Sequence, residues 1–406
     1  MTAYLKRELA GIIKRALEQM PVVVVSGMRQ VGKSTLLLRD SAFKGREYID
    51  LDDFSLLEAA KNDPESVLGR GERVTVDEAQ RCPELFLAIK RMVDAERTPG
   101  RFLLSGSANV SLLREVTESL AGRAIYFNLL PITIREKRRN IVEEPFILRF
   151  AKELRLDGIY ERHAPIPDDL VLEGGMPQML LGDIEDRGMW FKGYEQTYLE
   201  RDLRDIASVD NILAFRRLLS LAAHRTAQVL NLSNLAQDAG INRSTCERYL
   251  GLLNVSFITH ILPPYLRSAP ARIRKSPKLM MADSGIAAYL AGVDDLAGSP
   301  MRGALFENYV FQNLLGVLEP HLIRTNIYYW QIAGRHEVDF VLEIGREIVA
   351  IEVKAATRWG NSDLSGLQAF ISRYPECKAG ILAYNGREAV SLGGKIWAIP
   401  LSLLLS

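Results

Sequence analysis

Short apolar runs alternate with amphipathic segments between residues 20 and 130, and the runs are rich in Val, Ile, Leu and Phe. Runs that are apolar along most of their length are typical of parallel strands that helices cover on both faces. The pattern therefore predicts an α/β domain built on a parallel sheet. The expected strands are Val22–Ser26, Glu47–Leu51, Val74–Asp77, Phe102–Ser105 and Ile125–Leu129.

The pattern changes after the charged stretch Arg135–Glu144. Residues 145–230 have helical periodicity, and residues 231–290 predict a small helical module. From Met301 onward a helical segment precedes closely spaced strands, which predicts a separate α/β unit. The strands expected there are Ile327–Trp330, Glu337–Glu343, Ile348–Lys354, Ala379–Tyr384 and Ile396–Pro400.

Composition narrows the classes of protein that remain. A chain of 406 residues exceeds one compact core, and a net charge of +1 means that any nucleic-acid surface must come from local clustering. The three cysteines are far apart in the sequence, which argues against a zinc site and fits a reducing cytoplasm. The longest apolar run, Ile396–Leu405, is about half as long as a membrane-spanning helix. We expect it to be a buried terminal strand of a soluble, cytoplasmic protein without a membrane partner.

A phosphate-binding pattern, G-x-x-x-x-G-K-[ST], follows the first predicted strand and opens a helical segment. Its glycines let backbone N–H groups converge on phosphate oxygens, where Lys33 would reach the β- and γ-phosphates and Ser34 would bind Mg²⁺. A strand–turn–helix junction that needs glycine only for its backbone is the alternative. The expected nucleotide contacts are Gly27, Met28, Arg29, Gln30, Val31, Gly32, Lys33, Ser34 and Thr35.

Two carboxylates end the third predicted strand, Val74-Thr-Val-Asp77-Glu78. In open α/β sheets, ligands bind at the carboxyl ends of the strands, so Asp77 would lie beside the phosphate loop and hold Mg²⁺. Glu78 would polarise the water that attacks the γ-phosphate. A strand that ends in Asp-Glu without any catalytic role is also common.

These motifs resemble the AAA+ branch of P-loop ATPases, in particular prokaryotic ATPases that continue into a poorly characterised carboxyl-terminal region. The resemblance covers most of the chain. Its phrases are Gly27–Thr35, Val76–Gln80, Leu104–Asn109, Ser119–Arg123, Gly174–Pro177 and Tyr198–Asp202.

The AAA+ resemblance implies further roles. Ser105 would be the polar sensor of the γ-phosphate, with Ser107 and Asn109 as alternatives. Arg123 would be an arginine finger offered to the nucleotide of a neighbouring subunit, although a surface Arg after a Gly turn has the same sequence. The cofactors implied are ATP and Mg²⁺, and the assembly implied is a homo-oligomer in the form of a hexameric ring.

Residues Leu232–Leu250 predict a helix–turn–helix, with Gly240 in the turn and Asn242 or Ser244 as the cap of the second helix. The segment resembles a winged helix, a fold that serves both as a DNA reader and as a protein-contact module. Basic residues from Arg267 to Lys278 would form the wing. The expected DNA contacts are Arg243, Ser244, Thr245, Arg248, Arg272, Arg274 and Lys275.

Period two places Glu352 and Lys354 on one face of a strand, and a hairpin would bring Asp339 alongside them. With Glu307 on the preceding helix, this arrangement resembles the PD-(D/E)xK nuclease-like fold, which includes archaeal Holliday-junction resolvases. Val338 stands where that motif often has proline. The resemblance implies a second divalent metal at Glu307, Asp339 and Glu352, with Asp339, Glu352 and Lys354 catalytic. Glu-x-Lys also fits any exposed strand edge, and the fold also occurs as a module that binds without cleaving.

The sequence therefore predicts Mg²⁺-dependent ATP hydrolysis coupled to binding or remodelling of DNA, including branched DNA such as Holliday junctions. The rival hypothesis is a nucleotide-gated switch or scaffold whose nuclease-like domain binds but does not cleave. The domains expected are an AAA+ core at residues 1–135, a helical lid or linker at 136–230, a winged-helix-like module at 231–295 and a nuclease-like domain at 296–406.

Overall fold

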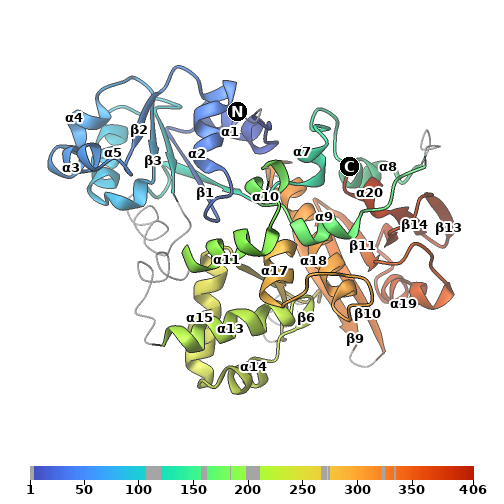
Figure 1. Ribbon diagram of the computed structural model, residues 1–406. Coiled ribbons are helices and arrows are strands. Elements are labelled where there is room, and N and C mark those ends of the chain that lie inside the picture. The colour runs from blue at the N-terminus through green and yellow to red at the C-terminus, as the bar shows by residue number, and fades with distance from the viewer. Residues whose placement is uncertain are drawn as a thin grey trace.

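The computed structural model describes residues 4–106, 120–156, 162–182, 184–197, 211–266, 272, 275–321, 325–332 and 335–406. Figure 1 shows a sheet of the amino-terminal half, a mostly helical middle region and a second sheet near the carboxyl terminus. Ser107, Asn109, Arg274 and the segment 198–202, all named above, lie outside the described residues.

The amino-terminal sheet is parallel, as predicted, and its described strands are arranged in the order β2-β3-β4-β1-β5. The order places β1, which leads into the phosphate loop, between β4 and β5, and it places β4 between β1 and β3. The carboxyl ends of β1, β4 and β3 are therefore neighbours. The strands are β1 (Val22–Gly27), β2 (Glu47–Asp50), β3 (Val74–Asp77), β4 (Phe102–Ser105) and β5 (Ala124–Leu129).

Helices cover both faces of this sheet. Successive residues of each strand point to opposite faces, and both sets are apolar, so both faces must be buried. Val23 and Val25 pack on the side of the first helix, whereas Val22 and Val24 pack against the helices that follow β2 and β3. The helices of this part are α1 (Leu9–Leu17), α2 (Lys33–Arg39), α3 (Phe54–Asn62), α4 (Pro64–Leu68) and α5 (Glu84–Ala95).

Short helices connect the first sheet to the rest of the molecule. A capping box between Thr133 and Glu136 starts the first of them, which fixes where the chain leaves the sheet. One continuous hydrophobic core includes one face of the first sheet, this connection, the middle helices and the carboxyl-terminal sheet. The connecting helices are α7 (Ile134–Lys137), α8 (Phe146–Glu153), α9 (Asp168–Glu173), α10 (Pro177–Leu181) and α11 (Arg187–Thr197).

The middle region combines helices with a small antiparallel sheet in the order β6-β8-β7. The helix before residue 231 packs on the two predicted helices, so the expected boundary at residue 231 divides one packed unit. Asn242, rather than Ser244, caps the second helix by accepting from the Thr245 N–H at 2.8 Å. The elements are α13 (Ile212–His224), β6 (Gln228–Val229), α14 (Leu232–Ala239), α15 (Arg243–Val255), β7 (Thr259–Leu262), β8 (Lys278–Met281) and α17 (Ser284–Leu290).

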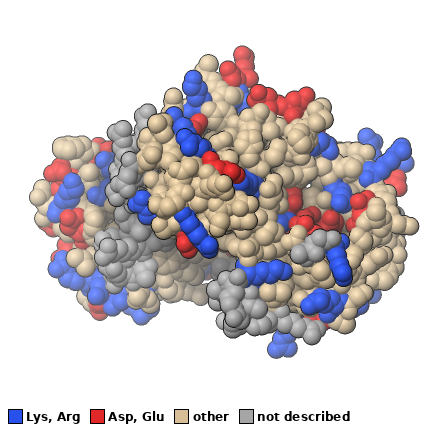
Figure 2. Space-filling view, turned by 90° about the horizontal axis from the view of Figure 1, so that it is seen from below, with Lys and Arg blue, Asp and Glu red and all other residues tan. Residues whose placement is uncertain are grey.

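The carboxyl-terminal unit is a mixed sheet in the order β13-β14-β12-β11-β10-β9, with α18 on one face and α19 on the other. Seen from below, acidic side chains gather in a hollow on this side of the molecule, with Lys and Arg around it (Figure 2). The elements are α18 (Arg302–Leu318), β9 (Thr325–Ile332), β10 (His336–Ile344), β11 (Glu347–Lys354), α19 (Ser365–Arg373), β12 (Ala379–Tyr384), β13 (Val390–Gly393), β14 (Ile396–Pro400) and α20 (Leu401–Leu404).

Two details of this unit differ from the prediction. The terminal apolar run is a strand only as far as Pro400, whose ring favours the start of a helix, and the buried leucines after it form α20. The edge strand β13 was not predicted, because its side chains are largely exposed and form no apolar run. Among the described residues, no helix is long and apolar enough to cross a membrane.

Candidate functional site: the phosphate loop and the pocket beside it

The loop between β1 and α2 depends on glycine at two positions. Gly27 has φ +152°, and a Cβ there would lie 2.3 Å from the Leu129 carbonyl oxygen of β5. Gly32 has φ +98° and stands directly before the first residue of α2. The backbone therefore needs glycine to make this turn against β5, which a phosphate-binding loop and a purely structural turn would both require.

Lys33 begins α2 and is 6% exposed. Its Nζ donates to the carbonyl oxygens of Gly27 at 3.0 Å and Met28 at 2.8 Å, so the ammonium group lies inside the loop that it follows. Ser34 and Thr35, on the same first turn, are exposed. The loop thus presents an ammonium group, two hydroxyl groups and the amino end of a helix at one edge of the sheet.

Asp77 ends β3 at the same edge and is 2% exposed. Its carboxylate accepts hydrogen bonds from the hydroxyl groups of Ser105, at the end of β4, and of Tyr48, the latter at 2.5 Å. Burial and the hydrogen bond to Asp77 raise the pKa of Tyr48 above its ordinary value. Tyr48 therefore remains a proton donor, and Asp77 is held in one orientation.

Glu78 follows in the left-handed region of the backbone, with φ +53°, which is uncommon for a residue other than glycine. Its carboxylate accepts from the side-chain amide of Gln80. The hydrogen bond and the backbone conformation together direct Glu78 away from the course of β3. Non-glycine residues held in this region often cluster at functional sites.

Arg123 lies just before β5 and is paired within its own chain. Its Nε and Nη2 atoms contact the two carboxylate oxygens of Asp94, on α5, at 2.6 and 2.8 Å. The hydrogen bond to Asp94 raises the pKa of Arg123 and lowers the pKa of Asp94. In this conformation the guanidinium group is bound to α5, away from the phosphate loop.

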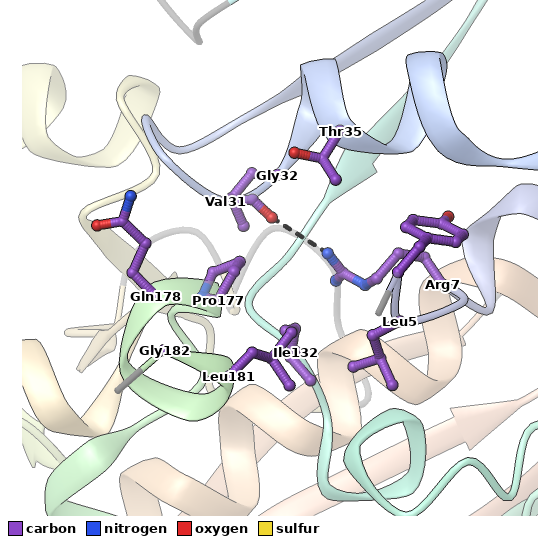
Figure 3. A pocket seen from close by; sticks show the side chains of 11 residues that line it. Leu5, Arg7, Val31, Gly32, Thr35, Ile132, Pro177, Gln178, Leu181 and Gly182 are labelled. Atoms are coloured by element: carbon purple, nitrogen blue, oxygen red, sulfur yellow. Dashed lines mark hydrogen bonds between the residues drawn. The ribbon is translucent and has the colours of Figure 1, made fainter. Parts of the chain in front are cut away.

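A pocket of about 220 Å³ lies beside Gly32 (Figure 3). Three parts of the chain supply its walls: the segment before α1, the loop with the first turn of α2, and the segments around Ile132 and α10. The lining is mostly apolar, with aliphatic side chains and the ring of Pro177 among its surfaces. The residues are Tyr4, Leu5, Arg7, Val31, Gly32, Thr35, Ile132, Pro177, Gln178, Leu181 and Gly182.

Arg7 fixes one wall of this pocket. It donates to the carbonyl oxygen of Val31 at 3.1 Å, drawn as the dashed line in Figure 3, and to that of Leu130 at 2.6 Å. It also forms a buried ion pair with Glu136 at 3.1 Å. The amino-terminal segment is therefore attached both to the phosphate loop and to the exit from the sheet. Neither this segment nor α10 was predicted to belong to the site.

The turn Gly174–Pro177 carries α10 into the pocket. The Ile132 N–H donates to the Gly175 carbonyl oxygen at 2.7 Å, and a Cβ on Gly175 would lie 2.6 Å from the Ile132 carbonyl oxygen. The Gly175 N–H donates to Asp283, the cap of α17, at 2.6 Å. Two consecutive glycines were the sequence signal for this close approach, and the sequence could not indicate its partners.

The predicted DNA contacts divide into two groups. Arg243, Ser244 and Arg248 are exposed at the start of α15, as expected, and Thr245 is half-buried beside them. The basic stretch that was predicted to form a wing is exposed only in part among the residues that the structure describes. Arg272 and Lys278 pack on the carboxyl-terminal unit, where acidic and aromatic partners are available, whereas Lys275 stays exposed.

Three contacts attach this basic stretch. Arg272 pairs with Glu343 at 3.3 Å, and its guanidinium group lies 4.5 Å from the ring centre of Tyr328. Lys275 donates to the carbonyl oxygen of Gln331 at 3.2 Å. Lys278 is fully buried. Arg272 is therefore half-buried and Lys278 is buried, whereas Lys275 is exposed as the wing prediction required.

In the carboxyl-terminal unit, β10 and β11 form the expected hairpin, with Phe340 paired to Ile351. The hairpin and α18 bring Glu307, Asp339 and Glu352 near one another, and Lys354 contacts Glu352 at 3.4 Å. The expected metal shell is not formed. Lys278 Nζ lies 2.8 Å from Glu307 and 3.5 Å from Asp339, so these carboxylates already bind a cation of the protein.

The described part of the chain contains no group of three or more His, Cys, Asp or Glu side chains arranged to hold a metal ion. In the carboxyl-terminal unit, Lys278 lies between the carboxylates that would otherwise have to face a metal ion. The carboxylates present do not fit a second divalent metal in this conformation.

Comparison with known proteins divides the chain into three parts. Residues 19–137 match the family described as "AAA domain". Residues 166–297 and 302–404 match two families described as domains of unknown function, DUF8612 and DUF4143. The first match agrees with the parallel sheet and the phosphate loop, and it supports ATP binding and ATPase activity.

Relatives and solved structures extend the comparison. The uncharacterized protein Rv2008c of Mycobacterium tuberculosis is 30% identical over 417 residues, covering 99% of this chain and 85% of that protein. A Walker-type ATPase of Pyrococcus abyssi has a TM-score of 0.43 at 16% identity, covering 71% and 96% of the two chains. The RuvB Holliday junction branch migration motor of Thermotoga maritima has a TM-score of 0.29 at 17% identity, covering 63% and 88%.

The structural similarities are too low to bear on function, whereas the similarity to the mycobacterial protein extends over almost the whole chain. The chain therefore belongs to the same family as Rv2008c of Mycobacterium tuberculosis, and its amino-terminal part is an AAA domain with a P-loop ATPase core.

Proposed function

We propose that this chain is a Mg²⁺-dependent ATPase that works as a nucleotide-gated switch, in which bound ATP connects the AAA domain to the middle region. The observation that carries the proposal is the pocket beside Gly32. Its walls come from the segment before α1, the phosphate loop and α10, and α10 is attached through Gly175 to Asp283 of the middle region. A ligand in that pocket would contact all three parts.

The base of ATP would occupy this pocket. Leu5, Ile132 and Pro177 offer apolar surface of the kind that suits a flat ring, and the pocket opens beside the first turn of α2. The triphosphate would then extend along the loop Gly27–Thr35, where Lys33 would exchange its two carbonyl partners for phosphate oxygens.

Mg²⁺ would be held by Ser34 and Asp77. The Ser34 hydroxyl is exposed on the first turn of α2, and the Asp77 carboxylate ends a neighbouring strand, so the two oxygen ligands fit this ion. Bound Mg²⁺ would neutralise charge on the β- and γ-phosphates.

Hydrolysis would use the chain's own polar groups. Glu78 would orient a water molecule and accept its proton as the water oxygen bonds to the γ-phosphorus and the bond to the bridging oxygen breaks. The products are ADP and inorganic phosphate. Ser105 donates to Asp77 from the strand between β3 and β1, so it would couple the presence of the γ-phosphate to the position of that carboxylate.

Arg123 would complete the site of a neighbouring copy in a ring-shaped homo-oligomer. For this role it must leave Asp94, since one guanidinium group cannot make both bidentate contacts at once. We propose that assembly exchanges this exposed intrachain pair for a contact between subunits, which would make ATP turnover depend on protein concentration.

A second candidate function, contact with DNA, is favoured by one observation. Arg243, Ser244 and Arg248 are exposed at the amino end of α15, and Arg243 borders a groove of about 880 Å³ between α14, α15 and residues 275–277. The helical arrangement supports a winged-helix-like module in which this helix end would meet a DNA groove, including that of branched DNA.

Hydrogen exchange combined with nucleotide titration tests the switch. We expect a slowly hydrolysed ATP analogue to slow amide exchange at residues 174–182 as well as at the phosphate loop. Lys33→Ala should abolish both effects, and Lys44→Ala, which changes an exposed lysine outside the loop, should retain both. Slowed exchange at the loop with no change at residues 174–182 would show that the base does not contact α10, and the gating proposal would fail.

A further inference from the structure

Lys278 is an unusual lysine because its whole side chain is buried. It is the first residue of β8, in the small sheet of the middle region, and its side chain is 1% exposed. Its Nζ lies 2.8 Å from Glu307 on α18, 2.8 Å from Glu337 and 3.5 Å from Asp339, both on β10. One ammonium group of the middle region is thus surrounded by three carboxylates of the carboxyl-terminal unit.

The electrostatics of this cluster keep the lysine charged. Burial alone would lower the pKa of Lys278, but the carboxylates of Glu307, Asp339 and Glu337 raise it above its ordinary value. Carboxylates buried this close to one another repel, so the cluster needs a cation, and the Lys278 ammonium group supplies it at 2.8 Å from both Glu307 and Glu337.

Asp339 is also bound from within the hairpin. The second oxygen of Asp339 accepts from the Val353 N–H at 2.8 Å. Lys354 Nζ lies 3.4 Å from one carboxylate oxygen of Glu352, so a second cation of the protein stands beside the third expected metal ligand. The Nζ atom of Lys278, 2.8 Å from the nearest oxygen of Glu307, occupies the place of a metal ion. Mg²⁺ at that place would need oxygen ligands at about 2.0–2.1 Å.

We propose that the ammonium group of Lys278 permanently replaces a divalent cation at Glu307, Asp339 and Glu337, and that the carboxyl-terminal unit is therefore a binding module without metal-dependent cleavage. The same contacts of Lys278 hold β8 against β10 and α18. Arg272, which reaches Glu343 and Tyr328 from the chain between β7 and β8, supports this connection. The inference does not depend on the phosphate loop, which lies in another part of the molecule.

Thermal unfolding of the full chain with and without Mn²⁺, in the absence of nucleotide, tests the proposal. We expect the unfolding midpoint of the wild type to be unaffected by Mn²⁺, because the protein cation excludes the metal. Lys278→Ala should lower the midpoint by several degrees, since it leaves buried carboxylates unpaired, and millimolar Mn²⁺ should restore much of the loss. Adding Asp339→Asn to Lys278→Ala should abolish this restoration.

Two further variants complete the experiment. Lys378→Ala removes a half-exposed lysine that pairs with Glu347 at 2.7 Å in the same unit, and it should change neither the midpoint nor the response to Mn²⁺. Lys278→Arg keeps a cation and should remain insensitive to Mn²⁺. If Lys278→Ala does not fold, a wild type and a Lys278→Arg that both ignore Mn²⁺ still support the proposal.

Three results would overturn it. The first is that Mn²⁺ stabilises the wild type and that Asp339→Asn removes this stabilisation. The second is that the wild type cleaves labelled junction DNA and that Asp339→Asn removes this cleavage. The third is that Lys278→Ala folds and has the wild-type unfolding midpoint both with and without Mn²⁺.

Discussion

The substitution Gly175→Ala tests whether the turn before α10 positions the nucleotide pocket. A Cβ at this residue would lie 2.6 Å from the Ile132 carbonyl oxygen and 2.7 Å from the Pro131 Cβ. Backbone atoms cannot give way as a flexible side chain does, so the turn must move away from residues 131–132. Overpacking of this kind costs about 1–3 kcal/mol. In the free protein, displacement of α10 would relieve this strain. Binding of ATP would have to bring α10 back and restore the strain, so the affinity for ATP would fall about 5- to 150-fold.

The assay compares nucleotide affinity, turnover at saturating ATP and the unfolding midpoint. We expect a larger dissociation constant for ATP and a nearly unchanged maximal rate of hydrolysis, because Lys33, Asp77 and Glu78 stay in place. Gly193→Ala is the matched control, since its Cβ would meet no atom within 4 Å on the exposed side of α11. A folded Gly175→Ala protein with wild-type affinity would refute the claim that α10 contributes to the nucleotide site.

Three other predictions concern the remaining contacts. Arg123→Ala should reduce ATP turnover by about 10³-fold or more while leaving nucleotide binding intact, and Asp94→Ala should keep turnover; steady hydrolysis by Arg123→Ala would exclude the finger role. Burial raises the pKa of Asp283 to about 6, above its unfolded value, so its contribution to stability is present at low pH and is lost as pH rises through about 6. Wild type should therefore exceed Asp283→Asn in unfolding free energy by more at pH 5 than at pH 7.5, by about 1.4 kcal/mol, and a constant difference would contradict this. Arg248→Ala should weaken DNA binding and reduce the salt dependence of log K by about 0.9, and an unchanged slope would mean that Arg248 contacts no phosphate.

The chain from β8 to α17 connects the features on which these predictions rest. Lys278 at the start of β8 holds the carboxyl-terminal unit, and Asp283 at the cap of α17 holds the turn that carries α10 into the pocket. Only a few residues separate the two contacts along the chain. Movement of α10 on nucleotide exchange would therefore be transmitted to β8, which is the physical basis of the proposed switch.

The sequence by itself determined the parallel sheet and the phosphate loop. Continuous apolar runs require burial on both faces, and the spacing of Gly27, Gly32 and Lys33 specifies a local turn that depends on neighbouring residues only. The hairpin of β10 and β11 could be predicted for the same reason, since period two and a short loop fix which residues face each other. Interactions within a few residues leave a pattern in the sequence.

The tertiary structure alone decided which distant groups meet. Arg7 reaches Val31 and Glu136, and Lys278, predicted to be part of an exposed wing, enters a carboxylate cluster 61 residues away in the chain at Asp339. The sequence could show that Lys278 was basic, but its burial depends on the packing of β8 against α18 and β10. A charge becomes a solvated surface group or a buried counter-ion according to what the fold places around it, and that environment is not encoded near the residue itself.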